Sequence, residues 1–363
     1  MESQNRASLQ TLAAASHPMV PANIMLSHRA WEPTMRRRDF VKAVGGIFVA
    51  WLPPAHAQHT KKIPRVGVLW HAGSAQEEAV YLGAFQQGLD GLGYVDGKTI
   101  RLEQRFPDEI PERFVSLANE LAGLRPDVLV AVTQQAALAA KQATATIPII
   151  FVDVPDPVGV KLVKSLSHPG SNITGLTHIA GELSGKRLAL FKEAFPQMTR
   201  MALLVNANDQ ETTKRYIDEA NAAATALGLN VQPVEVRSLA DLNEAFDKIV
   251  AGRLEGVAVP AEPLFYQGRS LVSQAAIARR LPLMVHSREL LEAGALMSYG
   301  PDQRRIFRRA AGYVDLILRG EKPADLPVEQ PTKFEFLINN KTAREIGFSI
   351  SESLLLRADE VIE

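Results

Sequence analysis

Short apolar runs alternate with amphipathic stretches after residue 57, and this alternation constrains the fold more than any other feature of the chain. The pattern is typical of parallel β-sheets with helices packed on their faces. It occurs in two successive arrays of similar size. In the first array we expect strands at 65–70, 100–106, 127–132 and 147–152, and helices at 79–92, 111–124 and 136–145. In the second we expect strands at 201–205, 230–235, 256–259 and 283–286, and helices at 183–195, 212–227, 239–251 and 271–280.

Turn-forming residues mark the segments that join the two arrays. Residues 169–175 (Pro-Gly-Ser-Asn-Ile-Thr-Gly) are predicted to be a hinge, and residues 296–300 a second connection. Beyond them we expect a helix at 303–318, a proline-rich crossover, a strand at 334–338 and a helix at 341–346. The predicted fold class is therefore α/β, with two doubly wound parallel-sheet lobes joined by a multi-crossover hinge. The expected divisions are an N-terminal extension (1–57), a first lobe (58–174, plus about 300–325), a second lobe (175–299) and a C-terminal part (326–363) that returns across the hinge.

The N-terminal extension has the features of an export signal. Arg36-Arg37-Arg38-Asp39-Phe40-Val41-Lys42 precedes an apolar run at 43–52, and Ala55-His56-Ala57 offers small residues for cleavage. The order of the arginines, Phe40 and Lys42 resembles the twin-arginine pattern, and Met35 is a candidate true start. About ten apolar residues are too few to span a bilayer, which needs about 20, so we expect the signal to be removed near Ala57 and the protein to be periplasmic.

Composition and missing motifs narrow the possible functions. Lys+Arg and Asp+Glu both total 40, so there is no broad positive field for nucleic acid. The absence of cysteine excludes disulfides, thiolate catalysis and a cysteine-linked lipid anchor. No Walker loop, nucleophile elbow or dinucleotide fingerprint is present, and the histidines show no i, i+4 pair. We therefore expect no catalytic residues, no metal and no cofactor.

The loops that follow the predicted strands are the candidate ligand site. In an open α/β sheet ligands bind beyond the carboxyl ends of the strands, where helix N-termini offer N–H groups. Small hydroxyl residues there suit a ligand carboxylate, a carboxylate suits a ligand ammonium, and Tyr299 or Trp70 offers an apolar face. The candidate residues are Gly73, Ser74, Thr133, Gln134, Asp156, Asn206, Asn208, Glu262, Ser287 and Tyr299.

Each candidate also has an ordinary structural interpretation. The hydroxyl and amide residues, such as Ser74, Thr133, Asn208 and Ser287, are typical helix caps. Asp156 stands between two prolines and could serve only to shape a turn. Trp70 at a strand end is more often a core residue than a ligand platform. The set of loops is therefore a firmer prediction than any one of its members.

Several stretches resemble the ABC transporter substrate-binding protein family that is related to tryptophan- and tyrosine-binding proteins. They are 65–70, 84–89 with 93–94, 140–144, 156–158, 169–175, 298–300, 309–311 with 313–315, 326–334 and 354–363. The resemblance implies the type I periplasmic binding fold, with a small-molecule solute held between two lobes. It also implies an ABC permease of the inner membrane as partner, and a monomer is expected. Ser171 departs from a glycine usual in the family, and the stretch 159–161 is shorter than in many relatives.

The sequence thus predicts a periplasmic solute-binding protein that captures an amino acid or related carboxylate and delivers it to an ABC importer. Two alternatives stay open at this point. One is a sensing module that reports ligand occupancy to a membrane receptor. The other is a periplasmic α/β enzyme in which carboxylates such as Asp156 and Glu262 do acid-base work.

Overall fold

The computed structural model describes residues 63–178 and 181–363, with side chains from residue 183 onward in the second range. The export signal and the start at Met35 lie outside these residues. Within the described residues the strands form two separate sheets, of five and seven strands. The prediction of an α/β protein with two mostly parallel sheets is confirmed.

The first sheet is entirely parallel, with strand order β2-β1-β3-β4-β5. Its strands are β1 (Arg65–Leu69), β2 (Arg101–Arg105), β3 (Val128–Val132), β4 (Ile149–Val154) and β5 (Ile173–Thr177). Helices α3 (Pro111–Gly123) and α4 (Gln134–Ala143) cover one face, and α2 (Ala79–Gly91) covers the other. The apolar strand residues are buried on both faces, as parallel sheets require.

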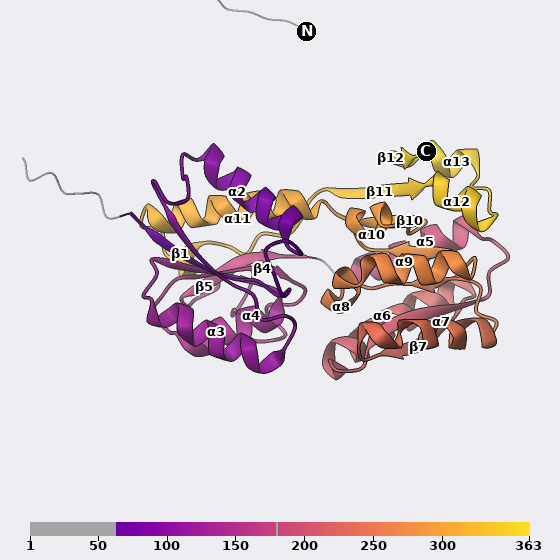
Figure 1. The fold of residues 1–363 in the computed structure, drawn as a ribbon, viewed down its shortest axis with the longest axis horizontal. Coiled ribbons are helices and arrows are strands. Elements are labelled where there is room, and N and C mark those ends of the chain that lie inside the picture. Colours follow the sequence, from indigo (N-terminus) through magenta and orange to yellow (C-terminus); the bar gives the residue numbers. More distant parts are fainter. Residues whose placement is uncertain (1–62, 179–180) are drawn as a thin grey trace, which may run out of the picture. The chain divides into compact units, whose positions relative to one another are not determined.

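Helix α11 (Gln303–Leu318) also belongs to this first layer, although it comes late in the chain. It lies alongside α2 in Figure 1, and Tyr313 and Val314 are buried in the same core as Phe85 and Leu89. A Cβ atom on Gly88 of α2 would lie 2.6 Å from the carbonyl oxygen of Arg308, so the two helices approach closely at that glycine. The chain therefore returns to the first sheet after building most of the second.

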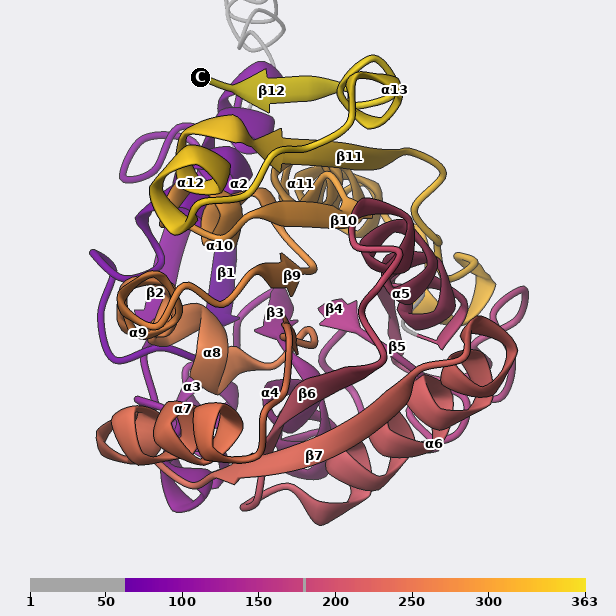
Figure 2. The same ribbon diagram turned by 90° about the vertical axis from the view of Figure 1, so that its right-hand side faces the viewer.

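The second sheet has the order β12-β11-β10-β9-β8-β6-β7 and is parallel except where β10 meets β11. Its strands are β6 (Arg200–Asn206), β7 (Asn230–Val236), β8 (Val257–Ala258), β9 (Leu283–Val285), β10 (Met297–Pro301), β11 (Phe334–Asn339) and β12 (Glu360–Ile362). Helices α5 (Gly181–Ala194) and α6 (Gln210–Leu227) cover one face, and α7 (Leu242–Ala251) and α9 (Arg269–Ala278) cover the other (Figure 2). The shorter helices are α8 (Pro263–Gln267), α10 (Arg288–Glu292), α12 (Asn340–Ile346), α13 (Glu352–Leu355) and the 3-10 turns at Leu239–Asp241 and Pro323–Asp325.

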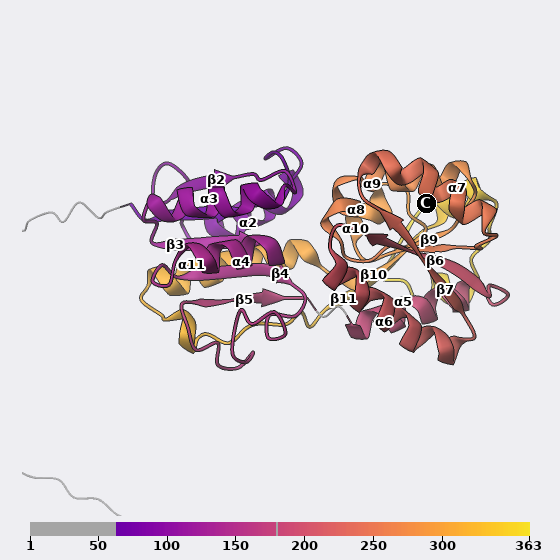
Figure 3. The same cartoon turned by 90° about the horizontal axis from the view of Figure 1, so that it is seen from below.

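Two predicted connections overlap with strands. Residues 169–175 were predicted to be a hinge, but Ile173–Thr177 form β5 at the edge of the first sheet (Figure 3), paired with β4. Residues 296–300 were predicted to be a connection, but Met297–Pro301 form β10 inside the second sheet. The chain passes between the sheets after β5, between β10 and α11, and before β11.

Candidate functional site

Polar side chains gather where the parallel strands of both sheets end. In the first sheet these are the segments after β1 and β3, the end of β4, and His178 directly after β5. In the second sheet they are the segments after β6, β8 and β9. This is the edge at which open α/β sheets bind ligands.

Asp153 is held in an unusual backbone conformation at the end of β4. The pairing of β4 with β5 shifts register between Val152 and Val154, so Asp153 is the extra residue of a bulge, with φ of 64°. Its Oδ1 atom lies 2.8 Å from Nδ1 of His178 and accepts a hydrogen bond of 3.0 Å from Nε2 of Gln303. Burial opposes ionisation of Asp153, but His178 and Gln303 outweigh it and lower the pKa of the carboxyl to about 2. Asp153 is therefore an anion at neutral pH.

Arg187 is a buried cation on helix α5 of the second sheet. Its side chain is 7% exposed, and its Nε donates a 2.7 Å hydrogen bond to the carbonyl oxygen of Tyr299. Burial lowers the pKa of the guanidinium to about 10, which still leaves it charged at neutral pH. No carboxylate of a described side chain lies within 4.0 Å of it. Burying a charge without a partner costs several kcal/mol, so this arginine is unusual.

His286, directly after β9, is within electrostatic range of both charges. It is buried, and its pKa is lowered to about 3 by burial and by the positive charge of Arg187, while Asp153 acts in the opposite direction. The imidazole is therefore neutral at physiological pH. Contacts along one short segment link these opposite charges. Arg187 bonds the carbonyl oxygen of Tyr299, a Cβ atom on the next residue, Gly300, would lie 1.9 Å from the carbonyl oxygen of His286, and Gln303 bonds Asp153. We therefore assign the two charges, one from each sheet, to one candidate site.

Buried polar atoms without hydrogen-bond partners surround this site. Each such atom normally costs about 1–3 kcal/mol, so native proteins contain few of them. Near the strand ends they are Thr133 Oγ1, Gln134 Oε1, His178 Nε2, His286 Nδ1, Ser287 Oγ and Gln303 Oε1. Thr133, like Asp153, has a positive φ (80°), which is rare for a β-branched residue and marks local strain. A bound polar ligand would provide the missing hydrogen bonds.

A column of five aromatic rings runs beside the site and joins the two sheets. Phe106 stacks on Trp70, Trp70 on Phe307, Phe307 on Tyr81 and Tyr81 on Tyr266, with centroid distances of 6.5, 5.9, 4.7 and 5.0 Å. The hydroxyl of Tyr81, on α2, also donates to Oε2 of Glu289, on α10, at 3.1 Å. These contacts connect helices of the first layer to helices of the second.

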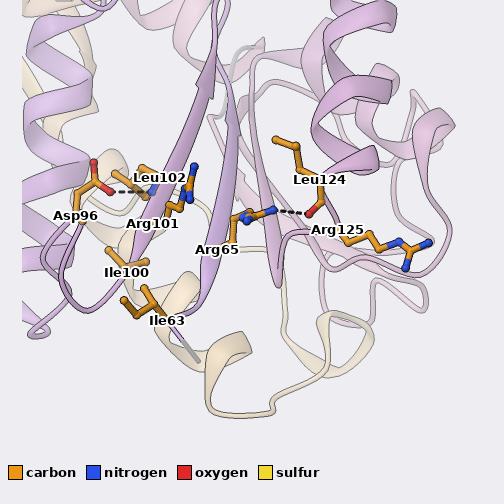
Figure 4. A pocket seen from close by; sticks show the side chains of 9 residues that line it. Ile63, Arg65, Asp96, Ile100, Arg101, Leu102, Leu124 and Arg125 are labelled. Atoms are coloured by element: carbon orange, nitrogen blue, oxygen red, sulfur yellow. Dashed lines mark hydrogen bonds between the residues drawn. The ribbon is translucent and has the colours of Figure 1, made fainter. Parts of the chain in front are cut away.

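A cavity of about 790 Å³ lies at the opposite end of the first sheet, where β1 and β2 begin (Figure 4). Arg65, Arg101 and Arg125 line it with Asp96, and Arg65 donates a 2.8 Å hydrogen bond to the carbonyl oxygen of Leu124. Although this cavity is large, it contains none of the unpartnered buried atoms. We therefore place the functional site at the carboxyl ends of the strands.

Comparison with known proteins identifies the family of this chain. The family model described as ABC transporter substrate binding protein matches residues 72–362. This chain belongs to that substrate-binding protein family. The predicted resemblance is therefore confirmed, and the family is one of solute-binding proteins.

Individual relatives of this substrate-binding protein carry informative names. The tyrosine-binding protein of Clostridioides difficile (strain R20291) is 27% identical over 263 residues, which are 72% of this chain and 75% of the relative. A conserved domain protein of Vibrio cholerae has a TM-score of 0.77 at 28% identity, over 83% of this chain and 100% of that one. An ABC domain from Streptococcus pneumoniae in complex with L-Trp has a TM-score of 0.75 at 25% identity, over 82% and 99%.

The sequence-predicted site residues of this substrate-binding protein fall into two groups. Thr133, Gln134 and Ser287 lie at the strand ends with unpartnered side-chain atoms. The remaining candidates have partners within the protein. In this second group Ser74 bonds Glu77, Gly73 lies against Asp108, Asp156 bonds the N–H of Gly159, Asn206 bonds Glu262, Asn208 bonds the carbonyl of Arg237, and the half-buried Tyr299 stacks on Phe334.

Sequence reasoning missed Asp153, His178, Arg187, His286 and Gln303. Asp153 follows the last residue of the strand expected at 147–152, so its position was a usable signal. Arg187 lies in the middle of a helix, where an arginine gives no sign that its side chain is buried. Among the side chains that the structure describes, no group of three metal-ligating residues is close enough to hold a metal ion, and no described helix is long and apolar enough to span a membrane.

Proposed function

We propose that this protein binds a small solute with a carboxylate group, an amino acid or a related acid, and delivers it to an ABC permease of the inner membrane. Arg187 is the observation that supports this most strongly. Its guanidinium is buried, charged, and has no carboxylate partner among the described side chains. A ligand carboxylate would supply that partner with the planar geometry that arginine favours. The ligands in the names of two relatives, tyrosine and L-Trp, belong to the same chemical class.

Binding would draw two lobes together around the solute, each built on one of the sheets. Two hydrogen bonds already join the layers beside the site, from Tyr81 to Glu289 at 3.1 Å and from Gln267 to Glu77 at 3.4 Å. A ligand held at the strand ends would add contacts on both sides. Closure of this kind needs no chemical step.

Delivery to a permease requires export, and we propose that the N-terminal extension directs this export. Replacing both Arg37 and Arg38 with lysine should leave the precursor in the cytoplasm, which fractionation and immunoblotting would detect. Export of the doubly substituted precursor at the wild-type level would rule out the twin-arginine route.

Ligand binding can be tested with the chain that begins at residue 58. Thermal unfolding would be recorded against the standard amino acids and a set of small organic acids. A ligand at 100 times its Kd stabilises the folded state by about 2.7 kcal/mol, so a true ligand raises the melting temperature measurably. If no member of the panel raises it, the proposed function is wrong.

Arg187→Met and Lys186→Met form a matched pair of variants for this test. Both lie on α5 and remove one positive charge, but Lys186 is exposed and Arg187 is buried. We expect Arg187→Met to abolish the ligand-induced shift and Lys186→Met to retain it. Equal shifts in the two variants would show that Arg187 does not hold the ligand.

A further inference from the structure

The carboxylate of Asp153 has one oxygen engaged and one oxygen open. His178 and Gln303 both contact Oδ1. Oδ2 has no partner among the described residues. The side chain of Asp153 is 27% exposed, whereas that of His178 is only 5% exposed. The internal contacts therefore orient the carboxylate and leave its second oxygen facing accessible space.

Neutralising the neighbouring histidines does not explain this open oxygen. His286 is neutral, and its own Nδ1 is unpartnered. The strained backbone at Asp153 would also be unnecessary if the residue only balanced His178, because an ordinary strand conformation costs nothing. Strain that is retained at a ligand-binding edge indicates that the position of the carboxylate matters for function.

We infer that Asp153 binds the ammonium group of the ligand while Arg187 binds its carboxylate, so that the site selects zwitterions over acids that lack an amine. This inference rests on the proposed function and names the determinant of its specificity. The two charges come from different sheets, Asp153 from β4 and Arg187 from α5. An acid without an amine would satisfy Arg187 but leave Oδ2 of Asp153 without a partner.

The first arm of the test uses the unmodified protein from residue 58. The amino acid that binds most tightly in the panel would be compared by calorimetry with its des-amino acid and its decarboxylated amine. We expect each analogue to bind at least about 30-fold more weakly, because one member of a buried charge pair then lacks its partner. A des-amino acid that binds as tightly as the amino acid would overturn the inference.

The second arm compares Asp153→Asn with Asp302→Asn. Asparagine has the shape of aspartate and tolerates positive φ, so Asp153→Asn is compatible with the bulge. Asp302 caps the helix that Gln303 begins and is similarly exposed (30%), so Asp302→Asn removes the same charge nearby and keeps a capping side chain. We expect Asp153→Asn to weaken binding of the amino acid at least about 30-fold and to leave the des-amino acid unaffected. Asp302→Asn should bind both like the unmodified protein.

The outcomes separate the two claims. If amino acids and des-amino acids bind equally well and Asp153→Asn changes neither affinity, only the zwitterion inference fails. If nothing in the panel binds the unmodified protein, both the proposed function and the zwitterion inference fail. Should Asp153→Asn not fold, the comparison of the three ligands on the unmodified protein still decides the matter.

Discussion

Replacing Glu262 with glutamine should stabilise the protein at alkaline pH and have no effect at acidic pH. Glu262 follows β8, is 5% exposed, and accepts a 2.8 Å hydrogen bond from Nδ2 of Asn206. Burial raises the pKa of this carboxyl from 4.5 to about 7; Asn206 lowers it, and the charges of Asp209 and Glu109 add to the increase. The side chain is therefore neutral in the folded protein at a pH where it is ionised in the unfolded chain.

The size of the effect follows from the two pKa values. The difference between 4.5 and about 7, at 1.36 kcal/mol for each pKa unit, corresponds to about 3 kcal/mol. Because the folded pKa is the higher one, this contribution is fully present below pH 4.5 and is lost as the pH rises through 7. Glutamine keeps the carbonyl oxygen that accepts from Asn206 but cannot ionise. The free energy of unfolding of Glu262→Gln should thus equal the wild-type value near pH 4.5 and exceed it by about 3 kcal/mol at pH 9.

Urea unfolding of both proteins at pH 4.5, 7 and 9 would measure this difference. Trp70 is a suitable probe, since it is the only tryptophan from residue 58 onward and is buried. Other groups that titrate between pH 4.5 and 9 affect both proteins alike and cancel in the comparison. Parallel pH profiles, or a variant less stable than wild type at pH 9, would refute the reasoning.

Three further predictions concern packing, closure and a buried cation. Gly83 of α2 faces open space, so Gly83→Ala should stabilise the protein by about 0.5–1 kcal/mol. Gly88→Ala on the same helix should destabilise it, because the new Cβ would lie 2.6 Å from a carbonyl oxygen of α11. Chemical unfolding of the two variants and the wild type would measure both effects. Tyr81→Phe should keep the aromatic stacking but lose the hydrogen bond to Glu289, which joins the two layers beside the site. We therefore expect calorimetry to show about tenfold weaker ligand binding. Burial alone would lower the pKa of His71, but two glutamates raise it to about 9, so its stabilising contribution is complete below pH 6.5 and lost as the pH rises through 9. His71→Gln should therefore be less stable than wild type by about 3 kcal/mol near pH 6, and the gap should close by pH 10 in the same unfolding assay.

The regular parts of both sheets were predictable because burial imposes a clear pattern on them. The runs at 66–69, 128–132 and 149–152 are apolar on both faces, and the structure places them in β1, β3 and β4. The intervening helices have a single apolar face and were located to within a few residues. Hydrophobic periodicity was thus sufficient to predict the fold class.

Two glycines explain why the connections were predicted incorrectly. Gly175 and Gly300 belong to the segments that were predicted to be a hinge and a connection, yet both lie within strands. A Cβ atom would lie 2.1 Å from the carbonyl oxygen of Phe151 at Gly175, and 1.9 Å from that of His286 at Gly300. Close packing requires glycine at both positions, and a single sequence cannot distinguish this from a need for flexibility.

The site was predictable only to the level of its loops. Strand ends give the edge at which a ligand binds, but whether a hydroxyl caps a helix or stays free depends on geometry. Ser74 bonds Glu77, whereas Ser287 begins α10 without capping it. Likewise, the environment of Arg187 depends on Tyr299, which is distant in the sequence.

The late position of α11 in the chain has a consequence for biosynthesis. Because α11 covers the first sheet beside α2, that layer cannot finish folding until residues 303–318 have left the ribosome. Nearly the whole chain must therefore be synthesised before either half reaches its final core. A secretion route that accepts only finished, native cargo would therefore have to wait until translation of this chain is complete.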